Sequence, residues 1–224
     1  MYHAVGTKVT GDSQRLYNMS PSTFMGQIDQ LSYSIDAGLL NIYSLPDGIT
    51  KTMGAVITFD DGYQDNLTVA APILLRYNLP FTVFVTPKML ASGDPRYLSP
   101  ATLKELSALP GVTIGAHGYS HEPLTTLSEQ ALALELYDSR VWIEDIIGTK
   151  VVTMSYPHGA VDQRVRTAVA KEGFLYAASS KFGAFRPGQD PLLISRTDIW
   201  ANDTEKRFNA KRSGAWDWMG LISN

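Results

Sequence analysis

The sequence predicts an α/β fold in which parallel strands alternate with helices in a barrel-like arrangement. Short β-branched runs and longer segments with helical periodicity alternate along the whole chain of 224 residues. Such alternation is typical of βαβ units, whose crossovers make neighbouring strands parallel. About seven such units, without an internal repeat, low-complexity tract or linker, favour one domain over residues 1–224.

The predicted strands are short apolar runs rich in β-branched and aromatic residues, a pattern that favours buried strands. They cover residues 2–5, 55–59, 81–85, 112–116, 151–155, 175–179 and 192–199. Polar side chains follow directly at Asp60, His117 and Tyr156. Because α/β folds place their chemistry at the carboxyl ends of the strands, these positions mark the candidate site.

Helices are predicted where apolar residues recur at helical spacing between capping signals. Ser20-Pro21 and Ser99-Pro100 each place a serine N-cap before a proline at the first helical position. Gly148 ends the longest helix, which Ser128 begins. The expected helices cover residues 21–37, 66–77, 100–109, 129–147, 161–172 and 204–219. The segments expected to be irregular are 6–19 and 39–54, the latter with a turn at Pro46-Asp47-Gly48.

Composition argues against several classes of protein. The net charge of −3 disfavours a general nucleic-acid binder, which normally carries a basic surface. The absence of cysteine excludes disulfides, iron–sulfur clusters and thiolate zinc sites. No apolar run is long enough to span a membrane, and no signal-peptide pattern opens the chain. The expected location is cytoplasmic if the chain is complete, and periplasmic or extracellular if an N-terminal segment was removed.

Two adjacent carboxylates, Asp60 and Asp61, follow the strand predicted at 55–59 and precede Gly62. Two adjacent side chains that leave a strand point in different directions. One carboxylate can therefore bind a metal while its neighbour transfers protons. The alternative is a turn, because Asp-Gly after a strand is a common turn signal.

His117 and His121 are four residues apart, just after the strand predicted at 112–116. On a helical turn, such residues share one face, so both imidazoles can reach one ion. Together with an aspartate from another strand end, they would leave positions open for water and substrate. Catalytic zinc sites and facial-triad sites for other divalent ions have this composition. The alternative is a structural role for each histidine.

Four stretches of the sequence together resemble the motifs of one enzyme family. They are Thr58–Tyr63, His117–Leu124, Ser155–Gly159 and Tyr2–Val5. The first two are similar to motifs of the NodB-homology polysaccharide deacetylases, carbohydrate esterase family 4. The third resembles that family's Tyr-Pro-Tyr-Gly motif without the leading arginine of other members. The fourth resembles the N-terminal Tyr-His-x-Val segment of the exopolysaccharide branch, which deacetylates poly-N-acetylglucosamine.

This resemblance implies a distorted (β/α)7-type barrel of the NodB-homology kind and a role for each motif residue. Asp61, His117 and His121 would hold one divalent metal, with Zn²⁺ expected first and Ni²⁺, Co²⁺ or Fe²⁺ as alternatives. Asp60 would be the general base that activates water. The backbone N–H of His158 would help to stabilise the oxyanion. The reaction would release acetate and an amine.

The chain also departs from the common pattern of this family. Many members take their general acid from a C-terminal Leu-x-His motif, but no histidine follows His158 here. We therefore predict His3 as the acid, as in the exopolysaccharide branch, with His158 as the alternative. Arg196 is the candidate substitute for the missing arginine, and would keep Asp60 ionised and oriented. The alternative for Arg196 is an ordinary surface arginine.

Aromatic residues near these motifs are candidates for contact with a sugar. Trp200 follows the last predicted strand and can stack on a sugar ring, while Tyr63 and Tyr156, with Pro157, can line the groove. Asp198 is expected to cap or form a turn rather than to catalyse.

Three functions remain open from the sequence. The first is metal-dependent N-deacetylation of an N-acetylated oligo- or polysaccharide in a bacterial surface polysaccharide or exopolysaccharide. The second is carbohydrate binding by a catalytically impaired domain, which the altered third motif motivates. The third is an amidase of the same fold that acts on small amides, although such members usually lose the metal-binding histidines.

Overall fold

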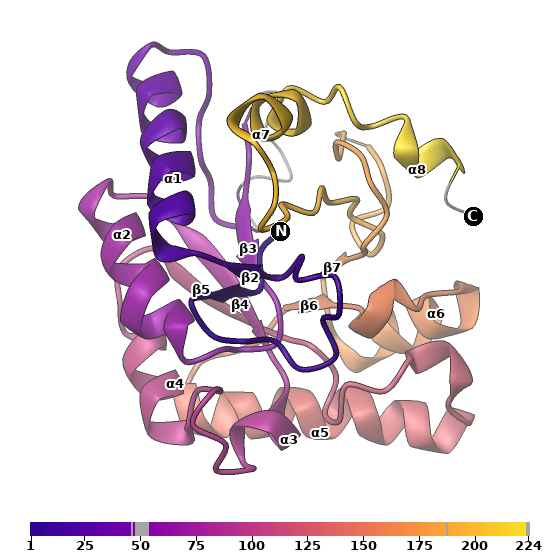
Figure 1. Ribbon diagram of the computed structural model, residues 1–224. Coiled ribbons are helices and arrows are strands. Elements are labelled where there is room, and N and C mark those ends of the chain that lie inside the picture. The colour runs from indigo at the N-terminus through magenta and orange to yellow at the C-terminus, as the bar shows by residue number, and fades with distance from the viewer. Residues whose placement is uncertain (46, 48–53, 187, 223–224) are drawn as a thin grey trace.

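A parallel sheet forms the centre of the computed structural model, and helices lie around it (Figure 1). The structure describes residues 1–45, 47, 54–186 and 188–222, and within these residues the sheet has five strands in the order β3-β4-β5-β6-β7. All neighbouring strands in it are parallel. The strands are β3 (Ile57–Phe59), β4 (Phe81–Val85), β5 (Val112–Ala116), β6 (Thr153–Ser155) and β7 (Tyr176–Ala178).

Both edges of this sheet are extended by segments that are not regular strands. At the β3 edge, Tyr2 N–H donates to the Thr58 carbonyl at 2.8 Å, and Asp60 N–H donates to the Tyr2 carbonyl at 3.0 Å. At the β7 edge, Ile194 N–H donates to the Ala177 carbonyl at 2.9 Å. The chain therefore continues the parallel arrangement beyond β3 and β7.

Met1 joins these two edge segments. Its backbone nitrogen donates to the Thr197 carbonyl at 2.8 Å, and its own carbonyl accepts Ile199 N–H at 3.0 Å. Hydrogen bonds thus run from β3 across to β7, on to residues 194–199, and back to β3 through the N-terminal residues. This curled, nearly closed sheet agrees with the predicted barrel-like α/β fold.

The strand predicted at 192–199 is wrong as a regular element. Within the described part of the chain, it forms only one isolated bridge, between Ala178 and Ile194. The reason is that its backbone hydrogen bonds are divided between β7 and Met1, so no continuous ladder forms. The run at 2–5 is divided too: Tyr2 bridges β3, whereas β1 (Ala4–Val5) pairs with β2 (Asn18–Met19).

The capping signals begin and end helices as predicted. The Ser20 hydroxyl accepts Thr23 N–H, and Ser99 forms a reciprocal capping box with Thr102. Gly148 has a φ of +74° at the end of α5. The helices concerned are α1 (Pro21–Asp36), α4 (Pro100–Ser107) and α5 (Glu129–Ile147), and α6 (Gln163–Glu172) follows.

Other helical segments differ from the prediction. The segment at 66–77 begins as a π-helical turn (Asn66–Ala70) and continues as α2 (Ala71–Arg76). The helix predicted over 204–219 is divided into α7 (Glu205–Arg212) and α8 (Met219–Ile222). Gly214 lies between them with a φ of +79°, a conformation that ends an α-helix. A short helix after β4, α3 (Pro87–Leu90), was not predicted, and the turn expected at 46–48 lies outside the described residues except for Asp47.

An aromatic cluster fixes the N-terminal segment against α1 and the sheet. The ring of Tyr2 lies 5.2 Å from that of Phe24 and 5.6 Å from that of Phe59. Its hydroxyl donates to the side-chain carbonyl of Gln27 at 3.0 Å. Aromatic pairs contribute about 0.5–1.5 kcal/mol beyond the burial of their area. The next residue, His3, is therefore held near the carboxyl end of β3.

The helices in the described part of the chain are too short or too polar to span a lipid bilayer.

Candidate active site

The candidate site lies where the carboxyl ends of neighbouring parallel strands meet. Asp60 and Asp61 directly follow β3, and His117 directly follows β5. Ser155 is the last residue of β6. In parallel α/β sheets the carboxyl ends of the strands share one edge, so side chains distant in sequence converge there.

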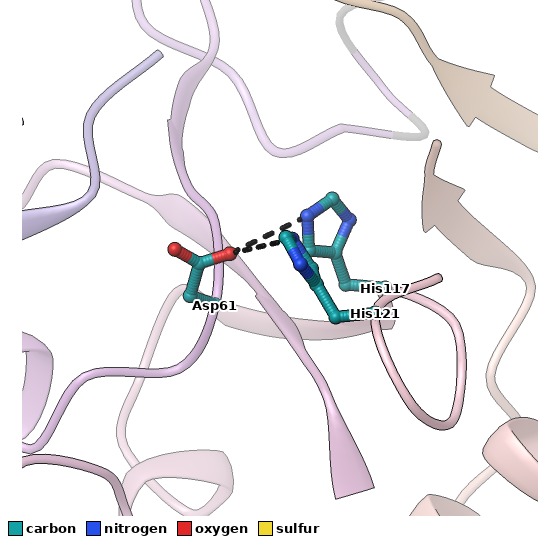
Figure 2. Close-up of side chains that lie close together, drawn as sticks. All are labelled: Asp61, His117 and His121. Atoms are coloured by element: carbon teal, nitrogen blue, oxygen red, sulfur yellow. Dashed lines mark ion pairs between the residues drawn. The ribbon is translucent and has the colours of Figure 1, made fainter. Parts of the chain in front are cut away.

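A carboxylate and two imidazoles form a compact group in this region (Figure 2). Asp61 Oδ1 lies 3.5 Å from His117 Nε2 and 3.3 Å from His121 Nε2. The three candidate ligand atoms all lie within 4.8 Å of one another, and Asp61, His117 and His121 together form a candidate metal-binding group. Asp61 is 8% exposed, and its Oδ1 accepts no hydrogen bond among the described residues. A buried carboxylate oxygen without a donor, facing two imidazole nitrogens, is the arrangement that a divalent metal satisfies.

Neighbouring groups fix the orientation of His117. Its Nδ1 lies 2.9 Å from the carbonyl oxygen of Ser155. Since a carbonyl can only accept, Nδ1 carries the proton and the lone pair of Nε2 faces Asp61. Burial lowers the pKa of His117 from 6.5 to about 4, although the nearby aspartates oppose this shift. His117 is therefore neutral near pH 7, as a metal ligand must be.

Charge and burial compete at the other two members of the group. Burial alone would raise the pKa of Asp61, but the contact with His121 at 3.3 Å and the charges of the neighbouring histidines outweigh it and lower that pKa. Burial alone would lower the pKa of His121, but Asp61 outweighs it and raises that pKa. The pair thus stabilises opposite charges on its two members, which is the behaviour expected of a carboxylate and an imidazole held in contact.

Three residues of the site have backbone conformations that L-residues rarely adopt. The φ angles of Asp61, His121 and His158 are +75°, +68° and +57°. Left-handed conformations of non-glycine residues cost on the order of 1–3 kcal/mol and are concentrated at functional sites. The contacts around these residues must therefore hold the backbone in place.

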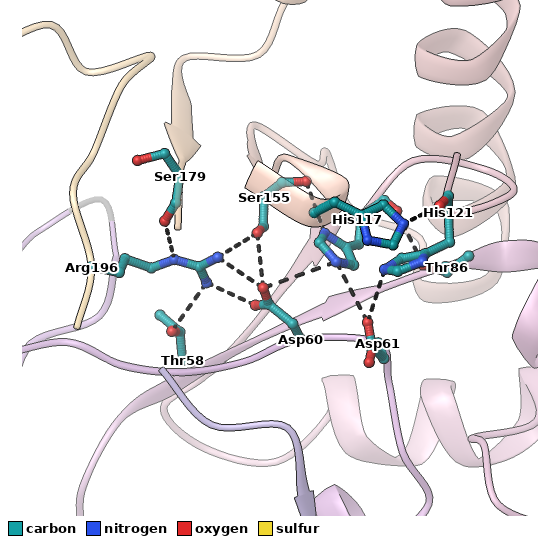
Figure 3. A network of polar contacts seen from close by, with 10 residues as sticks. Thr58, Asp60, Asp61, Thr86, His117, His121, Ser155, Ser179 and Arg196 are labelled. Atoms are coloured by element: carbon teal, nitrogen blue, oxygen red, sulfur yellow. Dashed lines mark hydrogen bonds and ion pairs between the residues drawn. The ribbon is translucent and has the colours of Figure 1, made fainter. Parts of the chain in front are cut away.

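Asp60 forms a buried, two-pronged ion pair with Arg196 (Figure 3). The Nη1 and Nη2 atoms of Arg196 donate to the two carboxylate oxygens of Asp60 at 2.7 and 2.8 Å. Asp60 is 2% exposed and Arg196 is 7% exposed. The predicted partnership of Arg196 with Asp60 is therefore present, whereas its alternative as a surface residue is wrong.

Further hydrogen bonds orient both members of this ion pair. The Ser155 hydroxyl donates to Asp60 Oδ2 at 3.0 Å and accepts from Arg196 Nη2 at 2.6 Å. Arg196 Nε donates to the Ser179 carbonyl at 2.9 Å. Burial alone would raise the pKa of Asp60, but the guanidinium of Arg196, with His117, holds that pKa far below its usual value. Asp60 Oδ2 also lies 3.9 Å from His117 Nε2, so the ionised carboxylate borders the metal-binding group.

One cavity of about 740 Å³ connects these elements. Its lining includes most of the predicted site residues, which are His3, Asp60, Asp61, Tyr63, His117, His121, Tyr156 and His158. Val9 to Asp12 of the N-terminal loop and Arg96 with Tyr97 also contribute to its wall. The structure thus brings both candidate acids, His3 and His158, into the cavity that contains the metal-binding group.

The aromatic candidates have different surroundings. Tyr63 is 2% exposed and its ring stacks 5.0 Å from that of Tyr97, so this pair forms part of the cavity wall. Tyr156 is fully buried, and its hydroxyl donates to the Leu192 carbonyl at 2.7 Å. Pro157 begins a short 3₁₀ turn that carries His158.

Trp200 does not line the cavity among the described residues. Its ring packs 5.9 Å from that of Trp216, and the ammonium nitrogen of Lys211 lies 3.7 Å from its ring centre. This cation–π contact is buried, since Lys211 is 2% exposed. The structure therefore places the half-buried Trp200 in an aromatic cluster with Trp216 and Lys211.

Asp198 is a cavity residue that sequence reasoning assigned to a turn or a cap. It is 8% exposed, and its Oδ1 has no hydrogen-bond partner among the described residues. Burial raises its pKa, and the charge of His3 opposes this shift. Residues 196 and 198 are two apart in a segment predicted as a strand, and in a strand this spacing directs both side chains to the same side. That spacing is the signal by which Asp198 could have been grouped with Arg196.

Comparison with known proteins identifies the family of the chain. The polysaccharide deacetylase family profile matches residues 47–177, which is more than half of the chain. The protein therefore belongs to the polysaccharide deacetylase family.

Similar sequences and structures agree with this membership. The polysaccharide deacetylase homologue YxkH of Bacillus subtilis (strain 168) is 28% identical over 155 residues, which are 69% of this chain. The chain spans about half, 54%, of the length of that relative. The crystal structure of BC0361, a polysaccharide deacetylase from Bacillus cereus, is 25% identical with a TM-score of 0.81, and the match covers 95% of this chain and 67% of that one.

Two more distant structures share the fold over nearly their whole length. The deacetylase PplD of Streptococcus pyogenes, solved in complex with acetate, has a TM-score of 0.83 at 20% identity, with 95% of this chain and 96% of that one covered. IcaB from Ammonifex degensii has a TM-score of 0.75 at 20% identity, with 96% and 94% covered. The predicted α/β fold of the NodB-homology kind is thereby confirmed.

The Asp60–Arg196 pair yields a prediction about stability. Arg196→Met is expected to lower the free energy of unfolding by about 3–5 kcal/mol, because it leaves a buried carboxylate without its partner. Urea denaturation measures this change. The single variant Asp60→Asn should also lower the free energy of unfolding. In the double variant Asp60→Asn/Arg196→Met, the decrease in this free energy should be smaller than the sum of the decreases in the two single variants.

Arg164→Met is the matched control, because the Arg164 side chain is 32% exposed and pairs with Glu129, which is 77% exposed. An exposed pair of this kind contributes at most about 1 kcal/mol. Equal losses for the Arg196 and Arg164 variants would contradict the proposed importance of the buried pair.

Proposed function

We propose that the protein is a metal-dependent hydrolase that removes acetyl groups from N-acetylated sugars of a bacterial surface polysaccharide or exopolysaccharide. The observation that carries this proposal is the placement of the ionised Asp60 beside the Asp61–His117–His121 group in one cavity. Membership of the polysaccharide deacetylase family supports it.

Asp61, His117 and His121 would hold the metal, and their donor atoms suit Zn²⁺ first, with Ni²⁺, Co²⁺ or Fe²⁺ as alternatives. A divalent ion held by these side chains supplies a Lewis acid that polarises the amide carbonyl and makes water more acidic. Three protein ligands leave coordination positions for the water and the substrate.

Asp60 is the general base in this proposal. Arg196 keeps its carboxylate ionised, and the Ser155 hydroxyl aims it, so that it accepts a proton from the attacking water. The oxygen of that water bonds to the acetamide carbon, and the carbon–nitrogen bond then breaks. The backbone N–H of His158, at the cavity wall, would stabilise the negative charge that develops on the carbonyl oxygen.

The leaving nitrogen needs a proton, and a histidine is suited to deliver it near neutral pH. His3 is our choice because it lines the cavity from the N-terminal segment and not from the loop that joins His117 and His121. Its ring lies 4.4 Å from that of Tyr17, which restricts its position. His158 is the alternative, but its Nε2 is already 3.1 Å from the carbonyl of His121, and its ring packs against His121.

The cavity is also large enough for a sugar. About 740 Å³ falls within the range of small-molecule sites, and the partly exposed Tyr97, which stacks on the buried Tyr63, provides an apolar wall for the CH face of a sugar ring. A chitin deacetylase from Cryptococcus neoformans is 30% identical over half of this chain, although the chain covers only 23% of that protein. This similarity favours an N-acetylated glycan as the substrate class.

The proposal predicts different effects for substitutions of the base, Asp60, and of the metal ligand, Asp61. Asp60→Asn should lower acetate release from an N-acetylated glycan to background while the protein still binds about one equivalent of Zn²⁺, because the amide cannot act as a base. Asp61→Asn should lose both zinc and activity. Acetate release is measured enzymatically and zinc by atomic absorption. Undiminished acetate release by the Asp60 variant would overturn the assignment.

A second prediction separates the two candidate acids. His3→Gln should lower kcat by about 10²–10⁴-fold, the usual contribution of general acid catalysis, with zinc content unchanged. His158→Gln should change kcat less, because its backbone N–H remains in place. Steady-state kinetics on the same glycan provides the comparison. A larger loss of kcat for the His158 variant would assign the acid to His158 instead.

A further inference from the structure

The two histidines of the metal-binding group are joined by a loop, residues 118–120, that contains no regular secondary structure. His117 is fixed independently of this loop. Its carbonyl accepts the Thr86 hydroxyl at 3.0 Å, and its ring contacts the Ser155 carbonyl. His121 lies at the far end of the loop with a φ of +68°. His158 contacts its carbonyl and ring from one side, and the position of His121 otherwise depends on what holds the loop. Lys88 N–H donates to the Tyr119 carbonyl of the loop at 3.0 Å, and the remaining anchors come from α5.

Helix α5 packs against this loop and contributes two polar side chains to it. Glu135 and Ser139 are four residues apart and so share one face of the helix. Ser120 N–H donates to Glu135 Oε1 at 2.6 Å, and the Ser120 hydroxyl lies 3.0 Å from both carboxylate oxygens. The Ser139 hydroxyl donates to the Gly118 carbonyl at 3.1 Å.

Glu135 also occupies the space beside the backbone of the loop. Gly118 has a φ of +67°, and a Cβ atom at this position would lie 3.0 Å from Glu135 Oε1 and 3.1 Å from Pro157 Cγ. The loop is therefore pressed between α5 and the turn that carries His158. Glycine suits this position because a side chain would be strained in this conformation and crowded by this close approach.

We propose that Glu135 is a positioning residue that holds the loop between the two histidine ligands and thereby aims His121 Nε2 at Asp61. A hydrogen bond from a backbone N–H to a carboxylate is charge-assisted and stronger than one between neutral groups. It anchors the residue immediately before His121, whose left-handed backbone needs support from its surroundings. This inference rests on the proposed metal site, because it concerns the affinity of that site.

Glu144 provides a matched control on the same helix. Its carboxylate also accepts a backbone N–H from a loop, that of Val151 at 2.9 Å, but this loop leads into β6. Removal of either carboxylate should lower the melting temperature. Only removal of Glu135 should change the binding of a metal.

The test is the affinity of the apoprotein for Zn²⁺, measured by competition with a chromophoric chelator, together with the visible absorption of the Co²⁺ form. Glu135→Ala should weaken Zn²⁺ binding by about ten-fold or more, the scale found when groups that orient metal ligands are removed, and should alter the Co²⁺ spectrum. Glu135→Gln retains one acceptor oxygen and should recover part of the affinity. Glu144→Ala should bind both ions like the wild type.

Wild-type affinity in the Glu135→Ala variant, or an equal loss in the Glu144→Ala variant, would overturn the role of Glu135 and leave the proposed function intact. Failure of the wild-type protein itself to bind Zn²⁺ or Co²⁺ would overturn the metal site, and the role of Glu135 with it. Circular dichroism of each variant shows whether a loss of affinity reflects a loss of fold, and a folded Glu135→Gln variant of intermediate affinity supports the inference.

Discussion

Asp60 and Arg196 carry opposite charges at 2% and 7% exposure, and a charge at that depth is tolerated only with a well-placed partner. Their ion pair joins the end of β3 to the segment around residues 194–199, which closes the curled sheet. Within the described part of the chain, this segment forms an isolated bridge to β7 rather than a regular ladder. The ion pair also sets the charge state of the proposed base. The same interaction thus links the closure of the fold to the chemistry of the site.

Closure of the sheet also explains why residues from both ends of the chain meet in one cavity. Met1 bonds to residues 197 and 199, and Tyr2 bonds to β3, so the N-terminal segment lies between the last segment and the first strand of the sheet. His3 and Asp198 consequently line the same cavity as the metal-binding group. A parallel sheet brings the carboxyl ends of its strands together. Here the N-terminal segment and the segment around residue 198 also reach this end of the sheet, because hydrogen bonds hold them at its two edges.

Sequence reasoning predicted the central sheet and the metal-binding group because both have local signals. Apolar runs indicate β4 and β5 with their observed bounds, and the pairing of His117 with His121 indicates a shared candidate site. The helical turn expected between these histidines is wrong, because an irregular loop joins them and His121 has a φ of +68°. Asp198 has only the weaker signal of its spacing from Arg196, and Glu135 has none. Their roles depend on which distant backbone they approach, and the pattern of a helix such as α5 shows only which side chains share a face. The contact of Trp200 with Lys211 could not be predicted either, because a sugar platform and a cation–π partner have the same appearance in sequence.

The central claim is that acetate release depends on a metal held by Asp61, His117 and His121. The most direct measurement is acetate release from an N-acetylglucosamine oligomer by the wild-type protein, before and after dialysis against a chelator. We predict that release falls to background without metal and returns when about one equivalent of Zn²⁺ is added. Release that persists after complete removal of metal would contradict the account, as would its absence with Zn²⁺, Ni²⁺, Co²⁺ or Fe²⁺ present.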